Sequence, residues 1–552
     1  MAQGGMTPVA EVRTVGDALE DLRIEDLTPE DDEGNMEYKW SLVKPSRERF
    51  PQLVTQMKFR LLEGQGEAIY QVGVEDDGRV RGLSDEALAA SLATLKRMAT
   101  ELGAETTVLR ESVGREGKCA EVLVRHIPES IEEYHDLRIA VAGNVDSGKS
   151  TLVGVLTGCG NLDNGRGRAR SQIFTHKHEI ESGRTSCVSQ QIMGFSSSGE
   201  VINYTSIRNL SWHDVVDKAS KVVTFFDLAG HERYLKTTLF GLTAHAPDYC
   251  MLLVGANMGV LRMTKEHLSI ALALKVPVFV VVTKIDIAPE HVREQTISQI
   301  MRLFKSSRKM PVLIKKDDQV SMAAKNMVND RVVPIFTVSN VTGDGLENLR
   351  SFLNLVSSRQ HWSEFVDQPA EFRIDETFMV QGVGTVVAGT ATSGSISAGQ
   401  WLSLGPDGNG KFTKVQVKSV HYKRVPVKRV VAGQAGALAL KKIKRSSVRK
   451  GMVLLDLTMR AGAVWSFKAE VMILYHGTTI KENYQPIIHC VTVRQAAKVI
   501  NMETEVIRTG DRANITFRFM YYPEYIKEGS RFVFREGRTK GIGKITSIIE
   551  TT

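Results

Sequence analysis

The sequence lacks the features that mark secreted, zinc-binding and membrane-spanning proteins. Its five cysteines are scattered over 552 residues, and no two of them stand in C-x-x-C spacing. This usage predicts neither a disulfide framework nor a zinc cluster, and it is typical of a reducing compartment. No apolar run is long enough to span a bilayer, and the first residues lack the basic-then-apolar order of a secretion signal. We therefore expect a cytoplasmic protein without a membrane segment.

An excess of one charge is missing from the chain as a whole but not from its beginning. The net charge is +8, from 71 basic and 63 acidic residues, yet residues 1–34 are acidic and poor in large apolar groups. Such a segment cannot bury enough apolar surface to offset the entropy of ordering, so we predict that residues 1–34 are disordered. The remainder is more basic, which permits a nucleic-acid partner without establishing one.

The length of the chain predicts several domains, the first of them a small α/β domain at 35–132. In this domain Ser84–Leu102 carries apolar residues at helical spacing, which predicts a helix. Strand-like runs occur at Gln56–Leu61, 68–75, 106–110 and 120–126. We find no catalytic constellation here, and turns explain its glycines better than a ligand does.

The rest of the chain predicts one α/β domain followed by two all-β domains. Residues 135–358 alternate apolar β-type runs with helical stretches, as a mostly parallel sheet demands. The predicted strands lie at 137–142, 221–227, 249–256, 276–283 and 332–339. Beyond residue 364 helical periodicity fades, and short strands with Gly-rich turns predict β-barrel domains at 364–457 and 465–552.

The first strand of the α/β domain runs into a phosphate-binding motif. Gly143, Gly148, Lys149 and Ser150 fit G-x-x-x-x-G-K-[ST] between the strand and a helical stretch. This order aims several backbone N–H groups at one point, where the helix dipole favours an anion. Lys149 would bind the β- and γ-phosphates, and the Ser150 hydroxyl would ligate Mg²⁺. The predicted loop is Gly143, Asn144, Val145, Asp146, Ser147, Gly148, Lys149, Ser150 and Thr151.

The next motif, Asp227-Leu228-Ala229-Gly230, closes the apolar strand at 221–227. Asp227 can hold Mg²⁺ through water, and the Gly230 N–H can meet a γ-phosphate, although an Asp in this place is otherwise often a helix cap. His231 follows directly and could orient the attacking water, the alternative being an ordinary surface histidine. Thr185, in a long polar segment before this strand, is the best candidate for the second Mg²⁺ hydroxyl, because a segment that orders around the γ-phosphate is a switch.

Two later motifs predict the base. Asp286 follows the strand at 276–283 within Thr283-Lys284-Ile285-Asp286, where its carboxylate can accept two N–H groups of guanine. Adenine offers no such pair of donors, so Asp286 selects GTP over ATP. Lys284 would pack its stem along the base, and in Ser339-Asn340-Val341 a backbone N–H can read guanine O6.

With these residues in view, the chain resembles the translational GTPases of the elongation factor Tu type, and within them the eukaryotic GTP-binding protein 1/2 family. The matching motifs are GNVDSGKST, DLAGHERY, TKEH (Thr264–His267), TKID, SNVTG, HKHEIESGRTS and GQGEAIYQVGVEDDG. The resemblance implies an α/β fold with a P-loop GTPase domain preceded by a small α/β domain and followed by two β-barrels. It also implies GTP hydrolysis to GDP with Mg²⁺, and a monovalent cation near Asp146.

Two positions depart from the class. Thr283 stands where the class usually has an Asn that braces the base and the phosphate loop. Thr has a shorter reach and no amide, so we expect a different nucleotide affinity or exchange rate. Arg184 replaces an apolar residue that, opposite the position of Val145, shields the water from the histidine.

The resemblance extends to both barrels. In the class, the third domain contacts the T stem of aminoacyl-tRNA, and the acceptor end lies between the GTPase domain and the second domain. Two groups of basic residues could meet RNA phosphates there, or they could form a solvated charged face. They are Lys441, Lys442, Lys444, Arg445, Arg449 and Lys450, and then Arg535, Arg538, Lys540 and Lys544.

We therefore expect a monomeric, cytoplasmic GTPase that binds aminoacyl-tRNA in its GTP form and brings it to the ribosome. One alternative is a GTPase of ribosome rescue or mRNA surveillance, which would share the same site. Another is an RNA-decay adaptor whose GTPase only times a conformational change. An ATPase conflicts with Asp286.

Overall fold

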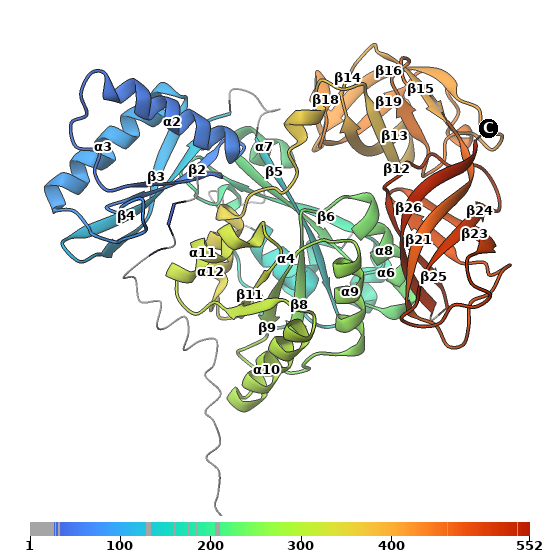
Figure 1. Ribbon diagram of the computed structural model, residues 1–552, viewed down its shortest axis with the longest axis horizontal. Helices are drawn as coiled ribbons and strands as arrows, with labels where there is room; N and C mark the ends of the chain where they lie inside the picture. The colour runs from blue at the N-terminus through green and yellow to red at the C-terminus, as the bar shows by residue number, and fades with distance from the viewer. Residues whose placement is uncertain are drawn as a thin grey trace, which may run out of the picture.

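The computed structural model describes residues 27, 29–30, 34–128, 134–158, 160–174, 176–183, 185–204, 210–460, 462–537 and 539–551. Most of the segment 1–34, together with Arg184 and Arg538, lies outside these residues. Figure 1 shows a small α/β unit beside a central α/β domain, with two barrels on the other side. This arrangement confirms the predicted fold class. Within the described residues, no helix combines the length and the apolar character that crossing a membrane requires.

The N-terminal unit is a four-stranded sheet in the order β1-β2-β4-β3 with two helices. The strands are β1 (Met36–Lys39), β2 (Glu67–Val72), β3 (Ala104–Val113) and β4 (Lys118–His126), and the helices are α2 (Arg49–Glu63) and α3 (Asp85–Glu101). The predicted helix at 84–102 is therefore present, and its N-cap Ser84 accepts a hydrogen bond from the Ala87 N–H at 3.3 Å.

One prediction for this part of the chain needs correction. The strand predicted at Gln56–Leu61 is wrong, because these residues lie in α2. Buried residues recur there at helical spacing, as in Met57 and Leu61, whereas Phe59 of the two-residue alternation is 47% exposed. The predicted disordered segment also contributes contacts to this unit: the Leu27 N–H donates to Gly78 O at 2.7 Å, and Glu30 pairs with Arg60 at 2.6 Å.

The central domain is built on a seven-stranded sheet in the order β10-β11-β9-β8-β5-β7-β6. All neighbouring strands are parallel except β6 and β7, as predicted for a mostly parallel sheet. The strands are β5 (His135–Gly143), β6 (Ser189–Phe195), β7 (Lys221–Asp227), β8 (Tyr249–Gly255), β9 (Val278–Thr283), β10 (Met310–Leu313) and β11 (Val332–Thr337).

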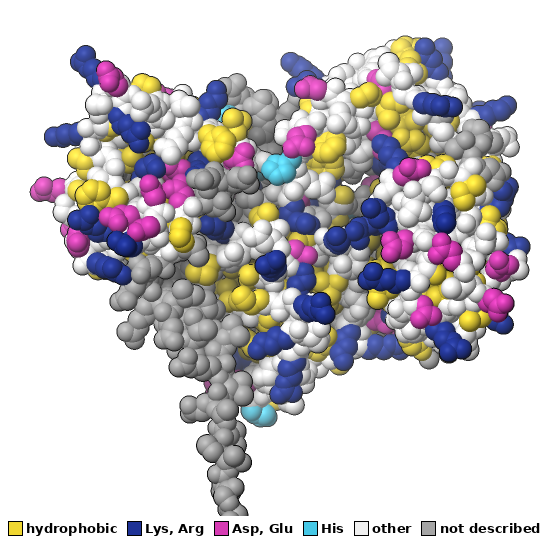
Figure 2. Space-filling model, viewed as in Figure 1, with side chains coloured by type: hydrophobic (Ala, Val, Ile, Leu, Met, Phe, Trp, Pro, Cys, Tyr) yellow, Lys and Arg dark blue, Asp and Glu magenta, His cyan; other side chains and the backbone are white. Residues whose placement is uncertain are grey.

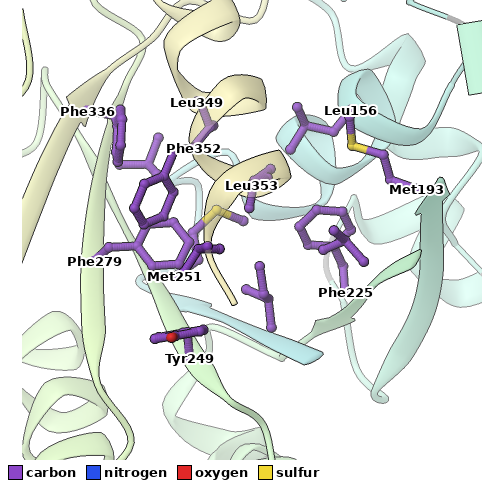
Figure 3. Close-up of a cluster of buried hydrophobic side chains, with 14 of the residues drawn as sticks. Leu156, Met193, Phe225, Tyr249, Met251, Phe279, Phe336, Leu349, Phe352 and Leu353 are labelled. Atoms are coloured by element: carbon purple, nitrogen blue, oxygen red, sulfur yellow. The ribbon is translucent and has the colours of Figure 1, made fainter. Parts of the chain in front are cut away.

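Helices cover both faces of this sheet. They are α4 (Lys149–Thr157), α5 (Arg168–Ser171), α6 (Lys177–Ser182), α7 (Trp212–Lys218), α8 (Leu235–Ala244), α9 (Arg262–Ala273), α10 (Glu290–Ser306), α11 (Asp318–Met327) and α12 (Leu346–Leu355). One apolar cluster holds residues of α4, α11 and α12, and another holds residues of α8, α9 and α10. Figure 3 shows the first cluster, in which Leu349 and Phe352 of α12 lie against Phe279 and Phe336 of the sheet.

Two barrels follow, as predicted, and the ring of each has six strands. In the second domain the ring β15-β20-β12-β13-β19-β16 closes through a β15–β16 pairing. Its strands are β12 (Glu371–Val380), β13 (Gly384–Ser393), β14 (Ser395–Ser397), β15 (Trp401–Gly405), β16 (Thr413–Tyr422), β17 (Val425–Val427), β18 (Arg429–Val431), β19 (Ala435–Leu440) and β20 (Val453–Leu455). The third domain is a closed barrel of β21 (Val464–Tyr475), β22 (Ile487–Cys490), β23 (Val493–Met502), β24 (Arg512–Phe519), β25 (Arg531–Glu536) and β26 (Thr539–Thr551).

The N-terminal unit is attached to the amino edge of the central sheet, where parallel strands begin. Buried Glu67 of β2 accepts hydrogen bonds from Arg125 of β4 at 2.7 Å and from Lys221, the first residue of β7, at 3.1 Å. Lys221 also donates to the carbonyl oxygens of Asn354 and Val356 at 2.7 and 2.8 Å. Each of these charges has partners from both units, so the two units form one packed body.

The second domain contacts the same edge through the turn between β16 and β17. Lys423 in this turn pairs with Asp136 of β5 at 3.1 Å and donates to the Thr224 hydroxyl of β7. The ring of Tyr422 stacks on Tyr134 with centroids 5.6 Å apart. The opposite edge of the sheet, where the strands end, is left for the loops that carry the predicted site.

Candidate functional site

The predicted site residues lie in the loops at the carboxyl edge of the central sheet. β5 ends at Gly143, β7 at Asp227 and β9 at Thr283, and the motif residues follow in each case. In α/β sheets this edge is where ligands bind. The fold therefore brings together segments that lie far apart in the sequence.

The phosphate loop turns sharply between β5 and α4. Gly148, the N-cap of α4, has a φ of 82°, which side chains other than glycine rarely allow. Lys149 opens the helix, and its ammonium donates to the carbonyl oxygen of Asn144 at 2.6 Å, back across the loop. Lys149 is 7% exposed, and burial lowers its pKa to about 8 although Asp227 and Asp146 raise it. The loop thus places a largely buried cation at the start of α4.

The three residues predicted to hold Mg²⁺ lie within hydrogen-bonding distance of one another. The Ser150 hydroxyl donates to Asp227 Oδ2 at 2.5 Å and lies 2.8 Å from the Thr185 hydroxyl, which is 3.4 Å from the same carboxylate oxygen. Asp227 is fully buried, and its Oδ1 has no partner among the described residues. Burial raises the pKa of Asp227 to about 6, against the lowering effects of Lys149 and Ser150. This set of oxygen donors fits a hard divalent cation such as Mg²⁺.

Gly230 lies directly against the phosphate loop. A Cβ at this position would be 2.4 Å from Lys149 Nζ and 2.9 Å from the Asn144 carbonyl carbon, so only glycine fits without displacing the loop. His231 follows, and it lines a cleft together with Lys149 and Gly230, which we call the phosphate cleft. The His231 Nδ1 accepts the Arg233 N–H at 3.1 Å. In the neutral ring the proton is then on Nε2.

The predicted base-reading residues form a second cluster. The Ser339 hydroxyl donates to Asp286 Oδ1 at 2.9 Å and accepts the N–H groups of Val341 and Thr342 at 3.2 and 3.1 Å. These bonds fix the position of the Asp286 carboxylate. Lys284, with a φ of 62°, and Asn340 belong to the same loops, and the Asn340 side chain lies beside Gly148.

Thr283 contacts the phosphate loop although its side chain is shorter than the Asn that is usual in the class. It is fully buried, and its hydroxyl donates to the carbonyl oxygen of Ser147 at 2.8 Å. The end of β9 is therefore tied to the phosphate loop without an amide. The second departure from the class, Arg184, lies outside the described residues.

Two residues that line or support the site were not assigned from the sequence. His267 of α9 was quoted only within the motif TKEH, yet its Nδ1 accepts the Gly143 N–H at 3.0 Å and fixes the start of the phosphate loop. Burial lowers the pKa of His267 to about 3, so the ring is neutral. Arg170 of α5 lines the phosphate cleft, although its sequence context is only a basic, Gly-rich stretch.

The basic groups of the barrels are partly used within the molecule. Lys540 pairs with Glu266 of α9, Arg449 with Glu524 at 2.7 Å, and Lys450 with Glu376. On the face seen in Figure 2, further Lys and Arg side chains gather where the central domain meets the third domain. The predicted Arg538 lies outside the described residues.

Comparison with known proteins matches this architecture domain by domain. Residues 135–359 match the elongation factor Tu GTP binding domain, residues 384–455 elongation factor Tu domain 2, and residues 461–549 the elongation factor Tu C-terminal domain. A crystal structure of the bacterial selenocysteine-specific elongation factor EF-Sec superposes with a TM-score of 0.54 at 19% identity, over 74% of this chain and 58% of that one. At this identity the likeness supports the fold alone.

Two curated relatives extend the match to the N-terminal unit. GTP-binding protein 1 of Xenopus laevis is 50% identical over 518 residues, which are 93% of this chain and 79% of that protein. GTP-binding protein 2 of Homo sapiens is 47% identical over 534 residues, which are 95% of this chain and 88% of that protein. Members of this class hydrolyse GTP to GDP, usually with Mg²⁺. The chain therefore belongs to the GTP-binding protein 1 and 2 family of elongation factor Tu-type translational GTPases, and it is a GTP hydrolase.

Proposed function

We propose that this chain binds aminoacyl-tRNA in its GTP form, engages the ribosome with it in the cytoplasm, and acts as a monomer. GTP hydrolysis would end the complex. The family membership supports a role in translation, and the structural neighbour EF-Sec is an elongation factor of the same fold. The choice of aminoacyl-tRNA as cargo rests on the resemblance to the elongation factors and on the arrangement of the barrels around the GTPase domain.

At the nucleotide site, each side chain receives one role. The loop from Gly143 to Thr151 binds the phosphates, with Lys149 on the β- and γ-phosphates and a monovalent cation beside Asp146. Asp286, Lys284 and the loop Ser339–Val341 bind guanine. Ser150, Thr185 and Asp227 hold Mg²⁺, which when bound neutralises charge that develops on the phosphates.

His231 and Gly230 make the site sensitive to the γ-phosphate. The Gly230 N–H donates to the γ-phosphate, and His231 orients the attacking water. The Nε2–H group of His231 faces the cleft, in the neutral or in the protonated ring. Ribosome contact would move His231 from the rim into the cleft. Slow intrinsic hydrolysis and fast stimulated hydrolysis follow from that movement.

The observation that carries the proposal is the packing of the third domain on α8. This helix follows His231 in the chain, and Leu235 and Leu239 of α8 share one apolar cluster with Val533 and Ile542 of the third domain. Loss of the γ-phosphate would release Gly230, shift α8 and so loosen the barrel. A cargo held across the domains would then be released on hydrolysis.

The experiment is equilibrium binding of aminoacyl-tRNA and of the same tRNA deacylated, at one stated salt concentration. Each is measured with a non-hydrolysable GTP analogue and again with GDP. We expect tight binding only when the tRNA is charged and the γ-phosphate is present. Binding that ignores both would contradict the proposal and leave an RNA-decay adaptor that binds RNA by charge.

Elongation and ribosome rescue would give the same result in that assay, because both use the same site. Translating ribosomes and stalled ribosomes with an empty A site, each added to the complex of GTP and charged tRNA, separate the two roles. We expect translating ribosomes to stimulate hydrolysis at least as strongly. Stimulation by stalled ribosomes alone would move the function to rescue.

A further inference from the structure

An arginine from the switch segment lies in the phosphate cleft. Arg170 belongs to α5, between the phosphate-loop helix α4 and Thr185. Its side chain lines the same cleft as Lys149, Thr185, Gly230 and His231. Its neighbours Arg166 and Arg168 are exposed and do not line this cleft. Arg170 therefore differs from its exposed basic neighbours, and a solvated charged loop does not account for its position in the cleft.

The short helix that carries Arg170, α5, contacts both the guanine-motif loop and the helix of the phosphate loop. Asp163 caps it, with its carboxylate accepting the Gly167 N–H at 3.1 Å and the Ala169 N–H at 2.9 Å. The Asp163 N–H in turn donates to Asn340 O at 2.8 Å, in the guanine-motif loop. These bonds connect α5, through Asp163, to the loop that is predicted to bind the base.

On the other side, α5 packs on the helix of the phosphate loop. A Cβ at Gly154 of α4 would lie 2.4 Å from the carbonyl oxygen of Ala169, so the missing side chain lets the two helices touch. Ala169 itself is 6% exposed. Arg170 is thus placed by a scaffold that contacts the phosphate loop and the base loop together.

The guanidinium of Arg170 has space but no carboxylate. It lies over Gly183, where a Cβ would be 3.1 Å from Arg170 Nη2, and its Nη1 donates to Gly183 O at 3.5 Å. No acidic side chain forms an ion pair with it among the residues that the structure describes. A planar cation at a phosphate cleft, without a carboxylate partner among the described residues, matches an anionic substrate.

We propose that Arg170 is a catalytic arginine supplied by the chain itself, which donates N–H groups to the γ-phosphate in the transition state. In that step the water oxygen forms a bond to the γ-phosphorus. The bond to the β–γ bridging oxygen breaks, and its electron pair stays on GDP. The water protons end on inorganic phosphate and solvent, and Arg170 neutralises the charge that spreads over the transferring oxygens.

The test compares Arg170→Ala with Arg168→Ala, a matched control on the same helix, in single-turnover GTP hydrolysis without ribosomes or tRNA. We expect Arg170→Ala to be slower by about a hundredfold and the control to match the parent. Affinity for a non-hydrolysable GTP analogue should change by only a few-fold in both. Equal hydrolysis rates in Arg170→Ala and the parent would overturn the proposal, and so would a fall in analogue affinity as large as the fall in rate.

Two further measurements separate catalysis from a structural role. The GDP–aluminium fluoride complex, which imitates the transferring phosphoryl group, should form in the parent and the control but not in Arg170→Ala; its undiminished formation would overturn the proposal. Arg170→Lys keeps the charge without the planar fork, and we expect it to lose about tenfold in rate. Full activity in Arg170→Lys would also overturn the fork geometry that we assign. Because all these readouts concern GTP hydrolysis alone, they are independent of the tRNA proposal.

Discussion

The two edges of the central sheet bury carboxylates in opposite ways, and β7 reaches both. At the amino edge, its first residue Lys221 pairs with Glu67, whose pKa is lowered to about 2 by Lys221 and Arg125 despite burial. At the carboxyl edge, its last residue Asp227 has a pKa raised to about 6 by burial, and its Oδ1 has no partner among the described residues. One carboxylate is satisfied within the fold, and the other is satisfied only with a ligand.

The lysines show the same difference. Among the described residues Lys221 donates to three acceptors, one carboxylate and two carbonyls, whereas Lys149 donates to the carbonyl of Asn144 alone. Complete pairing stabilises the contact between units, and incomplete pairing leaves binding capacity. We therefore assign a structural role to the amino edge and a binding role to the carboxyl edge, and variants at the two edges should affect different measurements.

The largest effect is expected from Lys149→Ala at the carboxyl edge. The variant loses the cation that we assign to the β- and γ-phosphates, so GTP affinity should fall at least about a thousandfold. The stability of the nucleotide-free protein should not fall, because no carboxylate forms an ion pair with this buried ammonium among the described residues. Fluorescent-nucleotide titration and urea unfolding measure the two quantities. A loss of affinity below about tenfold would contradict the assignment.

His231→Ala should affect the chemical step alone. We expect GTP binding to stay within a few-fold of the parent while ribosome-stimulated hydrolysis falls about a hundredfold to a thousandfold, the usual contribution of a group that orients the nucleophile. Rapid-mixing hydrolysis with saturating ribosomes gives the rate. Equal stimulated rates in variant and parent would remove His231 from the mechanism.

Glu67→Ala at the amino edge should do the reverse. It leaves Arg125 and Lys221 buried without their carboxylate, which costs about 3 kcal/mol or more of unfolding free energy. The GTP affinity of the folded fraction should not change, because Glu67 lies at the edge remote from the nucleotide. Urea unfolding with parallel nucleotide titration tests this. An exposed control, Glu86→Ala on α3, should leave both quantities unchanged.

Acid should weaken the amino edge. Burial lowers the pKa of His135 from 6.5 to about 4, so the folded state holds its ring neutral while the unfolded chain protonates. The contribution of His135 to stability is therefore constant above pH about 6.5 and is lost as pH falls toward about 4, by about 2 kcal/mol at pH 5. The raised pKa values of Asp227, Asp375 and Glu524 act in the opposite direction, so the test is the difference between the parent and a His135 variant. Urea midpoints at these pH values should be less separated in His135→Gln. His245 and His267, with pKa values lowered to about 3, leave a residual slope in the same direction. An equal change of midpoint between pH 7 and 5 in the parent and in His135→Gln would contradict this account.

The smallest effect concerns the brace at Thr283. Thr283→Val keeps the shape but leaves the Ser147 carbonyl without its donor, at a cost of about 1 kcal/mol. GDP dissociation should then be about fivefold faster, as measured by displacement of a fluorescent analogue. Thr283→Ser keeps the hydroxyl and should match the parent. An equal rate of GDP dissociation from Thr283→Val and the parent would show that the hydrogen bond to Ser147 does not contribute to nucleotide binding.

The nucleotide motifs could be placed from the sequence because their chemistry depends on short, local patterns at strand ends. The edge strands β6 and β10 were not predicted, since the first is rich in polar residues and the second is short and contains Pro311. The Gln56–Leu61 strand was wrong because alternation and helical spacing coincide in that stretch. Only burial decides between them.

The ion pairs between distant parts of the chain could not be predicted from the sequence. Glu67, Arg125 and Lys221 lie far apart in the chain, and a single charged residue near a strand end is normally solvated. Arg170 likewise gave no signal beyond a basic stretch, since its place in the cleft depends on Gly154 and Asp163. The roles assigned to the nucleotide-site residues stay predictions, although the fold brings Ser150, Thr185 and Asp227 together.

Hydrogen exchange on the full chain, with a non-hydrolysable GTP analogue and then with GDP, tests the contrast between the edges most directly. The account predicts that α8 and strands β22, β25 and β26 exchange faster with GDP, because the γ-phosphate no longer holds Gly230 and α8. Exchange in β2, β4 and α12 at the amino edge should be the same in both states. Identical exchange of α8 in the two states, or an equal change at both edges, would contradict it.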